Sequence, residues 1–538
     1  MNIENQYDAI VIGSGIGGLT TASLLTRLAG KRVLVLERHF KLGGFTHSFQ
    51  RKQFSWDPGL HYIGQMGAGS QLRDLFDLVT DGGVEWSPMP ERFERFVYPD
   101  FEFTVSSDRH QYLSDLQAMF PAEADAIARY FVDVKRATGW YQRFMATKVM
   151  PAPVGRLLEL RGRKLALTTT GEYLTSHFTD PRLRALLASQ WGDYGLPPSR
   201  SPFAVHALIV DHYLRGAWYP VGGGGAIAQA IVPVIERGGG ACVVNAEVEE
   251  ILVSRGKVTG VRVRRGQGTR HTVHTVHAPL VVSNAGADVT YTRLLPGSLG
   301  LPEQRLVREL PQSISAVQLF LGLDRSPREL GVRGENTWVF SSLDHDAAFD
   351  RQGETADGQP AGCFIVFPSV KDPTARAHTA EIIALVDDTQ FAAWAGEGWL
   401  HRGDDYTALK QRIAESLLDL ADRHVPGLRD SVVFSELASP LSLAHFTGTR
   451  SGACYGLAVT TERLKAHWLG VRTPVRGLLL TGSDVASPGV AGAMMGGVLS
   501  AASVLGPTGM MRVMRAARAR RAEPARSEPG MAEEMAAA

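Results

Sequence analysis

Glycines near the start of the chain have the spacing of a phosphate-binding turn. Residues 13–18 read Gly-Ser-Gly-Ile-Gly-Gly and follow an apolar run that ends at Ile12. In such a G-x-G-x-x-G turn, Gly13 allows the tight bend, Gly15 lets a pyrophosphate approach the backbone, and Gly18 lets the next helix pack on the strand. Free N–H groups at the start of that helix bind the phosphates. The segment therefore predicts a dinucleotide site.

An acidic residue follows at the position where a ribose would be bound. Glu37 comes at the end of a second apolar run, residues 32–36. Its carboxylate can accept hydrogen bonds from ribose hydroxyls. A carboxylate at this place favours an unphosphorylated ribose, so the residues predict FAD or NAD rather than NADP.

The elements that must position this site indicate an α/β fold of the Rossmann type. We expect a buried strand at 7–12, a helix at 17–28 and a second strand at 32–36, followed much later by a closing strand, turn and helix at 477–506. Further strands are expected at 241–244, 248–253, 258–264 and 280–283. The expected division is a discontinuous FAD-binding domain (1–106, 216–298, 435–508), an interleaved α+β substrate domain (107–215, 299–434) and a tail (509–538).

Composition excludes several classes of protein. The 538 residues are 44% hydrophobic with a formal net charge of +1, which does not fit a nucleic-acid-binding protein. Three widely spaced cysteines give no disulfide framework and favour a reducing compartment. The first residues lack a basic region followed by an apolar run, so we expect no signal peptide.

Two segments raise the question of a membrane. Residues 140–167 mix aromatic side chains, including Trp140 and Phe144, with Arg143, Lys148, Arg156, Arg161, Arg163 and Lys164. This mixture suits either a membrane surface or an amphipathic helix with a solvated basic face, and we expect peripheral attachment at the cytoplasmic face. Residues 485–511 carry no charge, but their glycines favour a buried helix over a membrane span. The tail is expected to be a short basic helix, adding a second basic contact at 512–521, and then disordered.

Four motifs in order resemble the amine oxidase and carotenoid desaturase superfamily. They are Gly43-Gly44 soon after Glu37, the strand around Val248, the segment Ser283-Asn284-Ala285, and Thr481-Gly482-Ser483-Asp484 before a helix that opens at Gly489. The resemblance implies non-covalently bound FAD, with the adenine received near Val248 and the ribityl chain held by Asp484. The cofactor contacts it implies are Gly13, Gly15, Ile16, Gly17, Gly18, Glu37, Arg38, Gly43, Gly44, Phe45, Thr46, Val248, Asn284, Gly482, Asp484, Gly489 and Val490.

Within that superfamily the chain is similar to the retinol saturase, carotenoid isomerase and phytoene desaturase group. The likeness rests on residues 43–64 (GGFTHSFQRKQFSWDPGLHYIG), 192–223 and 367–386 (FPSVKDPTARAHTAEIIALV). It implies an oxidoreductase that desaturates or saturates carbon–carbon bonds of a long hydrophobic lipid, either a polyene or a fatty acyl chain. We expect desaturation, since no second nucleotide domain is visible to deliver hydride. A nicotinamide nucleotide or a quinone stays open as the redox partner.

Two other functions are compatible with the same residues. One is a redox-neutral cis–trans isomerase of a polyene, and the other is a lipid-carrying escort protein resembling Rab-GDP-dissociation inhibitors. The intact Gly15, Glu37 and Asp484 argue against the escort, which needs no flavin.

His61 and Tyr62 are the candidate catalytic residues. They follow the glycine-rich flavin segment, so that His61 could donate or accept a proton or position the substrate; the alternative is a histidine that is only hydrogen-bonded within the cofactor site. His271, His274 and His277 have a spacing that sends strand side chains to opposite faces, so we expect no metal site. Gly223–Ala228 loosely resembles a second dinucleotide turn but lacks a suitable strand and acid after it.

Overall fold

Five parallel strands form the sheet that carries the glycine turn. The computed structural model describes residues 3–150, 152–267 and 270–522, and this sheet has the order β10-β2-β1-β14-β20. The strands are β1 Ala9–Ile12, β2 Val33–Leu36, β10 Ala241–Val243, β14 Val281–Ser283 and β20 Leu478–Leu480. β1, β2 and β14 are buried along their whole length, which is why their sequences are apolar without alternation. The α/β fold class is confirmed.

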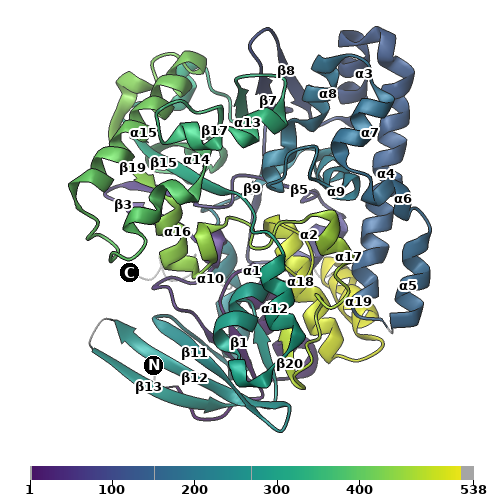
Figure 1. Cartoon of the computed structure of the whole chain (residues 1–538), viewed down its shortest axis with the longest axis vertical. Helices are drawn as coiled ribbons and strands as arrows, with labels where there is room; N and C mark the ends of the chain where they lie inside the picture. The colour runs from purple at the N-terminus through teal and green to yellow at the C-terminus, as the bar shows by residue number, and fades with distance from the viewer. Residues whose placement is uncertain (1–2, 151, 268–269, 523–538) are drawn as a thin grey trace, which may run out of the picture.

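Helices from the two ends of the chain pack against each other beside this sheet. α1 (Ile16–Ala29) and α18 (Gly489–Val504) meet through glycines, and α10 (Gly225–Arg237) packs on α1 as well. A Cβ on Gly17 would lie 2.6 Å from the Cα of Gly482, so the approach excludes any side chain there. Two helices that pack together in this domain therefore come from segments more than 400 residues apart in the sequence, coloured purple and yellow in Figure 1.

A three-stranded antiparallel sheet lies at the lower left of Figure 1. It consists of β11 (Ala246–Ser254), β12 (Lys257–Gln267) and β13 (Arg270–His277), with a register shift between Val248 and Glu250. On β13, His271 and His277 share one face and His274 occupies the other, because strand side chains alternate.

A seven-stranded sheet forms the centre of the second lobe. Its order is β19-β15-β18-β17-β16-β7-β8, antiparallel except for the parallel pair β16 and β7. The strands are β7 Arg92–Val97, β8 Glu102–Ser106, β15 Ser315–Leu323, β16 Asn336–Phe340, β17 Gly362–Val366, β18 His378–Val386 and β19 Val432–Ala438. The helix α15 (Gly403–His424) contacts β17, β18 and β19. β7, β8 and most of β19 belong to this sheet, although they fall in segments expected in the cofactor domain.

A group of helices, α3 to α9, stands at the right of Figure 1. The main members are α3 Arg109–Met119, α4 Ala124–Thr147, α5 Ala152–Leu160, α7 Thr170–His177, α8 Pro181–Ala188 and α9 Phe203–Tyr213. Trp140 and Phe144 of α4 are buried in their core, and Trp140 Nε1 donates to the carbonyl of Glu159 at 2.7 Å. Their expected insertion into a membrane is therefore wrong, because these rings already form the core between α4 and its neighbours.

The last described helix, α19 (Gly509–Ala522), packs on α18 and on α2 (Gln71–Thr80). Val513 and Ala517 are fully buried, and Arg521 Nε donates to Asp74 at 2.8 Å. The basic residues at 512–521 were expected to contact a membrane, but Arg512, Arg520 and Arg521 bond to the body of the protein. The predicted disorder of the tail concerns 523–538, which lie outside the described residues.

In the part of the chain that the structure describes, no helix alone has the length and apolar character of a bilayer span. The pair Gly489–Val504 and Gly509–Arg521 meets that test only together, and it is bent by 120°. α18 is largely buried within the fold, as its glycines predicted.

Candidate active site

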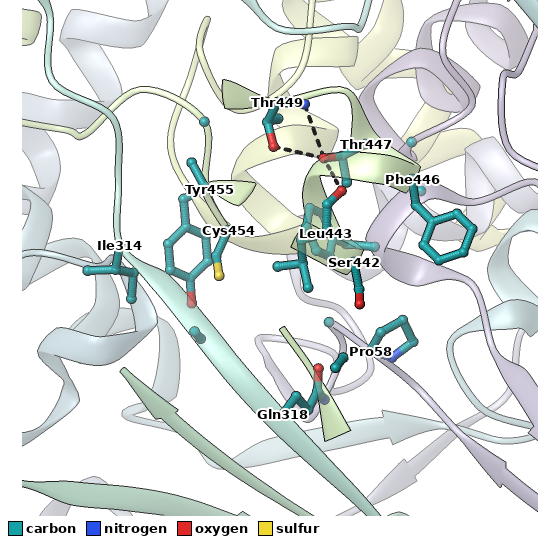
Figure 2. A pocket seen from close by; sticks show the side chains of 18 of the residues that line it. Pro58, Ile314, Gln318, Ser442, Leu443, Phe446, Thr447, Thr449, Cys454 and Tyr455 are labelled. Atoms are coloured by element: carbon teal, nitrogen blue, oxygen red, sulfur yellow. Dashed lines mark hydrogen bonds between the residues drawn. The ribbon is translucent and has the colours of Figure 1, made fainter. Parts of the chain in front are cut away.

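One cavity of about 910 Å³ connects the glycine turn to an apolar region of the second lobe. Its lining comes from the five-stranded sheet, from β15 to β18 of the seven-stranded sheet, and from the segment around α16 (Pro440–Thr447). Figure 2 shows Ile314, Gln318, Cys454 and Tyr455 facing this space together with residues of α16. Side chains that are far apart in sequence thus meet around a single cavity.

The turn between β1 and α1 forms one end of this cavity. Gly13 has φ 89°, a conformation that side chains disfavour, and a Cβ on Gly15 would lie 2.8 Å from the Asn284 Nδ2 atom. α1 begins at Ile16, so its free N–H groups point towards the glycine turn, where no side chain covers the backbone. Gly18 does not line the cavity; a Cβ there would collide with the carbonyl of Gly13, which confirms its packing role.

Glu37 is held in place by donors from the turn and leaves acceptor capacity unused. Its Oε2 accepts from the amide of Ser14 at 2.8 Å and from the Ser14 hydroxyl at 2.7 Å, while among the described residues Oε1 accepts from the amide of His39 alone, at 2.8 Å. Each carboxylate oxygen has two lone-pair positions. Oε1 can therefore accept one more hydrogen bond, and Glu37 lines the cavity.

Asp484 lies at the far side of the turn, between three segments of the chain. Its Oδ2 accepts from the amide of Ala287 at 2.7 Å and its Oδ1 from the amide of Leu457 at 3.0 Å. It lines the cavity just before Gly489, where α18 begins. This helix N-terminus gives the site positive electrostatic potential suited to an anionic group.

Most of the predicted cofactor contacts are brought together around this cavity. Those that line it are Gly13, Gly15, Ile16, Gly17, Glu37, Arg38, Gly43, Gly44, Phe45, Thr46, Val248, Asn284, Asp484, Gly489 and Val490. Gly482 does not line it and serves the packing of α1 on α18.

The other end of the cavity is lined by large apolar side chains. They come from the turn before α9 and from β15 to β18, and include Trp191, Ile314, Phe320, Trp338, Phe340, Phe364, Ile383 and Leu385. An apolar wall of this kind binds a ligand by removing hydrocarbon surface from water.

The two predicted catalytic residues differ in their access to the cavity. His61 lines it, and burial lowers the pKa of the ring to about 3, so His61 is a neutral imidazole at ordinary pH. Its Nδ1 atom is 3.6 Å from Glu381 Oε2, too far for a hydrogen bond. Tyr62 does not line the cavity, because its hydroxyl turns inward to two carboxyl groups.

Of those carboxyl groups, Glu94 was not foreseen as a site residue, whereas Asp193 lies in the segment 192–223 on which the family likeness rests. Glu94 is fully buried on β7, and Asp193 lines the cavity from the 3-10 turn Ser189–Asp193. For Glu94 the sequence signal was a glutamate among aromatic residues (Arg92-Phe93-Glu94-Arg95-Phe96), since a buried carboxylate needs partners that only the fold supplies.

The second glycine turn binds a carboxyl group that belongs to the chain itself. The amide of Gly224 donates to Asp57 Oδ2 at 2.7 Å, and the hydroxyls of Ser48 and Tyr219 also donate to this carboxylate. Asp57 therefore occupies the start of α10, where a dinucleotide phosphate would otherwise lie.

The comparisons with known proteins define the class. Residues 16–505 match the model of the family described as flavin containing amine oxidoreductase, so the chain belongs to this family. It is an FAD-dependent oxidoreductase, and the bare glycine backbone, the spare acceptor on Glu37 and the α18 N-terminus all fit that cofactor.

Particular relatives extend over nearly the whole chain. The all-trans-retinol 13,14-reductase of the zebrafish Danio rerio is 32% identical over 94% of this chain and 86% of that protein. A chloroplastic prolycopene isomerase of an Oncidium hybrid is 26% identical over 94% of this chain and 85% of that protein. Cyclohexylamine oxidase from Brevibacterium oxydans has the same fold, with a TM-score of 0.60 at 16% identity over 96% of this chain and 98% of that one.

Proposed function

We propose that the protein saturates a carbon–carbon double bond in a polyene lipid of the retinoid or carotenoid kind, using FAD. The observation that carries this proposal is the continuity of the cavity from the glycine turn to the aromatic wall of the seven-stranded sheet. A long hydrocarbon chain matches that wall. The relatives named as reductases favour saturation over the desaturation expected from the sequence.

The residues around the cofactor have separate tasks in this proposal. The turn at Gly13–Gly17 and the start of α1 would hold the pyrophosphate, Glu37 the ribose, the backbone at Val248 the adenine, and Asp484 the ribityl chain. Bound FAD in its reduced form supplies hydride chemistry to carbon. The protein would exclude water and orient the lipid, and neutral His61, which lines the cavity, would help to position it.

The test is product analysis with all-trans-retinol and a related carotenoid. Purified protein reduced with dithionite under anaerobic conditions should convert the lipid to a product heavier by two hydrogens. A product of unchanged mass would instead identify an isomerase, and one lighter by two hydrogens, formed with oxidised flavin, would identify a desaturase. Either result would contradict the proposal, and a flavin-free variant serves as the control.

We also propose that α5 and the residues after it attach the protein to the cytoplasmic face of a membrane. Leu157 and Leu160 are 70% and 62% exposed, and Arg161 and Lys164 are exposed beside them. Exposed leucines next to cations suit the boundary between anionic headgroups and acyl chains. Lys148, expected on this surface, instead donates to the carbonyl of Leu469 at 2.8 Å.

A further inference from the structure

Three neutral donors converge on the carboxylate of Glu94. Tyr62 Oη and Trp338 Nε1 each lie 2.7 Å from Oε1, and Gln190 Nε2 lies 2.7 Å from Oε2. The register of β16 beside β7, with Asn336 opposite Glu94, brings the Trp338 ring to this position. Donors to a buried carboxylate favour its anionic form and oppose the effect of burial on its pKa.

The Tyr62 hydroxyl lies between two carboxyl groups but has only one proton. It is 2.7 Å from Glu94 Oε1 and 2.8 Å from Asp193 Oδ2. If Tyr62 donates to Glu94, the contact with Asp193 can be a hydrogen bond only when Asp193 carries a proton and donates it to the tyrosine oxygen. The side chain of Asp193 has no other hydrogen bond within the described residues, whereas Glu94 has three.

The charges around the pair agree with this arrangement. Burial raises the pKa of Asp193 well above its ordinary value, and the charge of Glu94 raises it further. Burial also raises the pKa of Glu94, to about 7, against the opposing effect of its three donors and of Lys371. The other titratable groups that act on the pair are tyrosines that burial keeps protonated: Tyr112, Tyr194, Tyr213 and Tyr455.

Of the three groups Tyr62, Glu94 and Asp193, Asp193 alone lines the cavity. Asp193 lines the cavity beside Trp191, Trp338 and Phe364, while Tyr62 and Glu94 lie behind it. The neutral ring of His61 also lines the cavity, but a neutral imidazole is a far weaker acid than a carboxyl group. The wall that would hold the lipid therefore presents one carboxyl group that the fold keeps protonated.

We propose that Asp193 donates the proton that completes saturation of the double bond, and that Glu94 is a positioning residue that acts on it through Tyr62. This proposal rests on the proposed function. Adding hydrogen across the double bond takes a hydride at one carbon, from reduced flavin, and a proton at the other. The Asp193 O–H bond breaks as the new C–H bond forms, and the Tyr62 hydroxyl can then turn from Glu94 to stabilise the new carboxylate. Solvent returns the proton after the product leaves.

The protonation of Asp193 can be measured without any substrate. The infrared spectrum of the flavin-loaded protein at neutral pH should contain the carbonyl stretch of a protonated carboxyl group that is absent from the spectrum of Asp193→Asn. In Glu94→Gln this band should vanish at a lower pH, by about one unit or more, because a nearby negative charge no longer opposes ionisation. An unchanged band in Asp193→Asn would overturn the proposal.

The donor role is measured in a single turnover of the dithionite-reduced protein with all-trans-retinol. At equal flavin content, Asp193→Asn should be about 100- to 10,000-fold slower, and Asp193→Glu should recover part of the rate. The alkaline limb of the pH profile should move to lower pH in Glu94→Gln, which a merely structural role would not produce. A near-normal rate in Asp193→Asn would refute the donor. Failure of the proposed function would look different, since the wild-type protein would then give no saturated product while the infrared band remained.

Discussion

At the scale of single residues, the site depends on carboxyl groups whose partners differ. Glu37 accepts three hydrogen bonds from the turn and the following backbone, and Asp57 accepts donors at the start of α10. Glu94 and Asp193 instead share the hydroxyl of Tyr62. These carboxyl groups thus differ in the number of donors that they meet, and Asp193, with one hydrogen bond among the described residues, is the one that we propose as the acid.

Replacing Glu37 tests the ribose contact directly. Glu37→Arg should lower the affinity for FAD at least about tenfold, because a hydrogen bond to a charged group is worth about 1.5–3 kcal/mol and the new cation is also unpaired. The measurement is flavin absorbance per protein after gel filtration, and Glu91→Arg, at an exposed position, is the control. Full flavin content in Glu37→Arg would show that Glu37 does not hold the ribose.

At the scale of elements, α4 and α5 differ in which apolar side chains they bury, although the sequence analysis treated them as one segment. α4 buries its aromatic face against α9, whereas α5 leaves leucines exposed. Both helices have the composition of an amphipathic helix. Only the packing shows that the aromatic residues belong to the core of the fold and that the leucines are exposed.

The membrane surface is tested by liposome sedimentation. The double variant Leu157→Ser, Leu160→Ser should bind anionic vesicles at least about tenfold more weakly than the wild type, since each leucine contributes apolar area. The control is Val273→Ser with Val433→Ser, two residues exposed on β13 and β19, which should bind normally. Trp140→Ala should instead destabilise the fold by about 3–5 kcal/mol. Unchanged vesicle binding by the leucine variant would contradict the assignment of α5.

At the scale of the whole molecule, buried neutral histidines link stability to pH. His206 is fully buried, its Nε2 lies 2.7 Å from the Tyr130 hydroxyl, and burial lowers its pKa to about 3. Burial likewise lowers the pKa of His61 to about 3 and of His212 to about 4. These rings are spread over α9 and the segment beside the cavity, so their effects on folding add up.

Acid should therefore unfold the protein in a way that His206 accounts for in part. Between about pH 6.5 and 3 the unfolded chain binds a proton at His206 that the folded protein does not, so stability is complete above this window and falls as pH falls. The share of one histidine is at most about 1.4 kcal/mol per pH unit. His206→Gln should reduce the pH slope of the free energy of unfolding measured in urea. Tyr130→Phe should lower stability and keep the slope; equal slopes in wild type and His206→Gln would contradict this account.

The sequence by itself determined the nucleotide half of the protein. The glycine turn, Glu37 and the closing strand and helix at 477–506 are local patterns, in which backbone conformation and helix N-termini create the binding groups. Strands buried on both faces also have a recognisable apolar sequence. For these reasons β1, α1, β2, β20 and α18 could be predicted, together with most residues that line the nucleotide end of the cavity.

Only the tertiary structure decided the strand pairing, the burial and the side-chain contacts in the rest of the protein. β7 and β8 join a sheet whose remaining strands come from residues beyond 314, because strand pairing between distant segments leaves no local signal. Whether Trp140 is buried or exposed depends on which helix covers it. The network of Tyr62, Glu94 and Asp193 assembles from three separate segments, and a shared proton exists only where the fold removes the carboxyl groups from water and brings them to one hydroxyl.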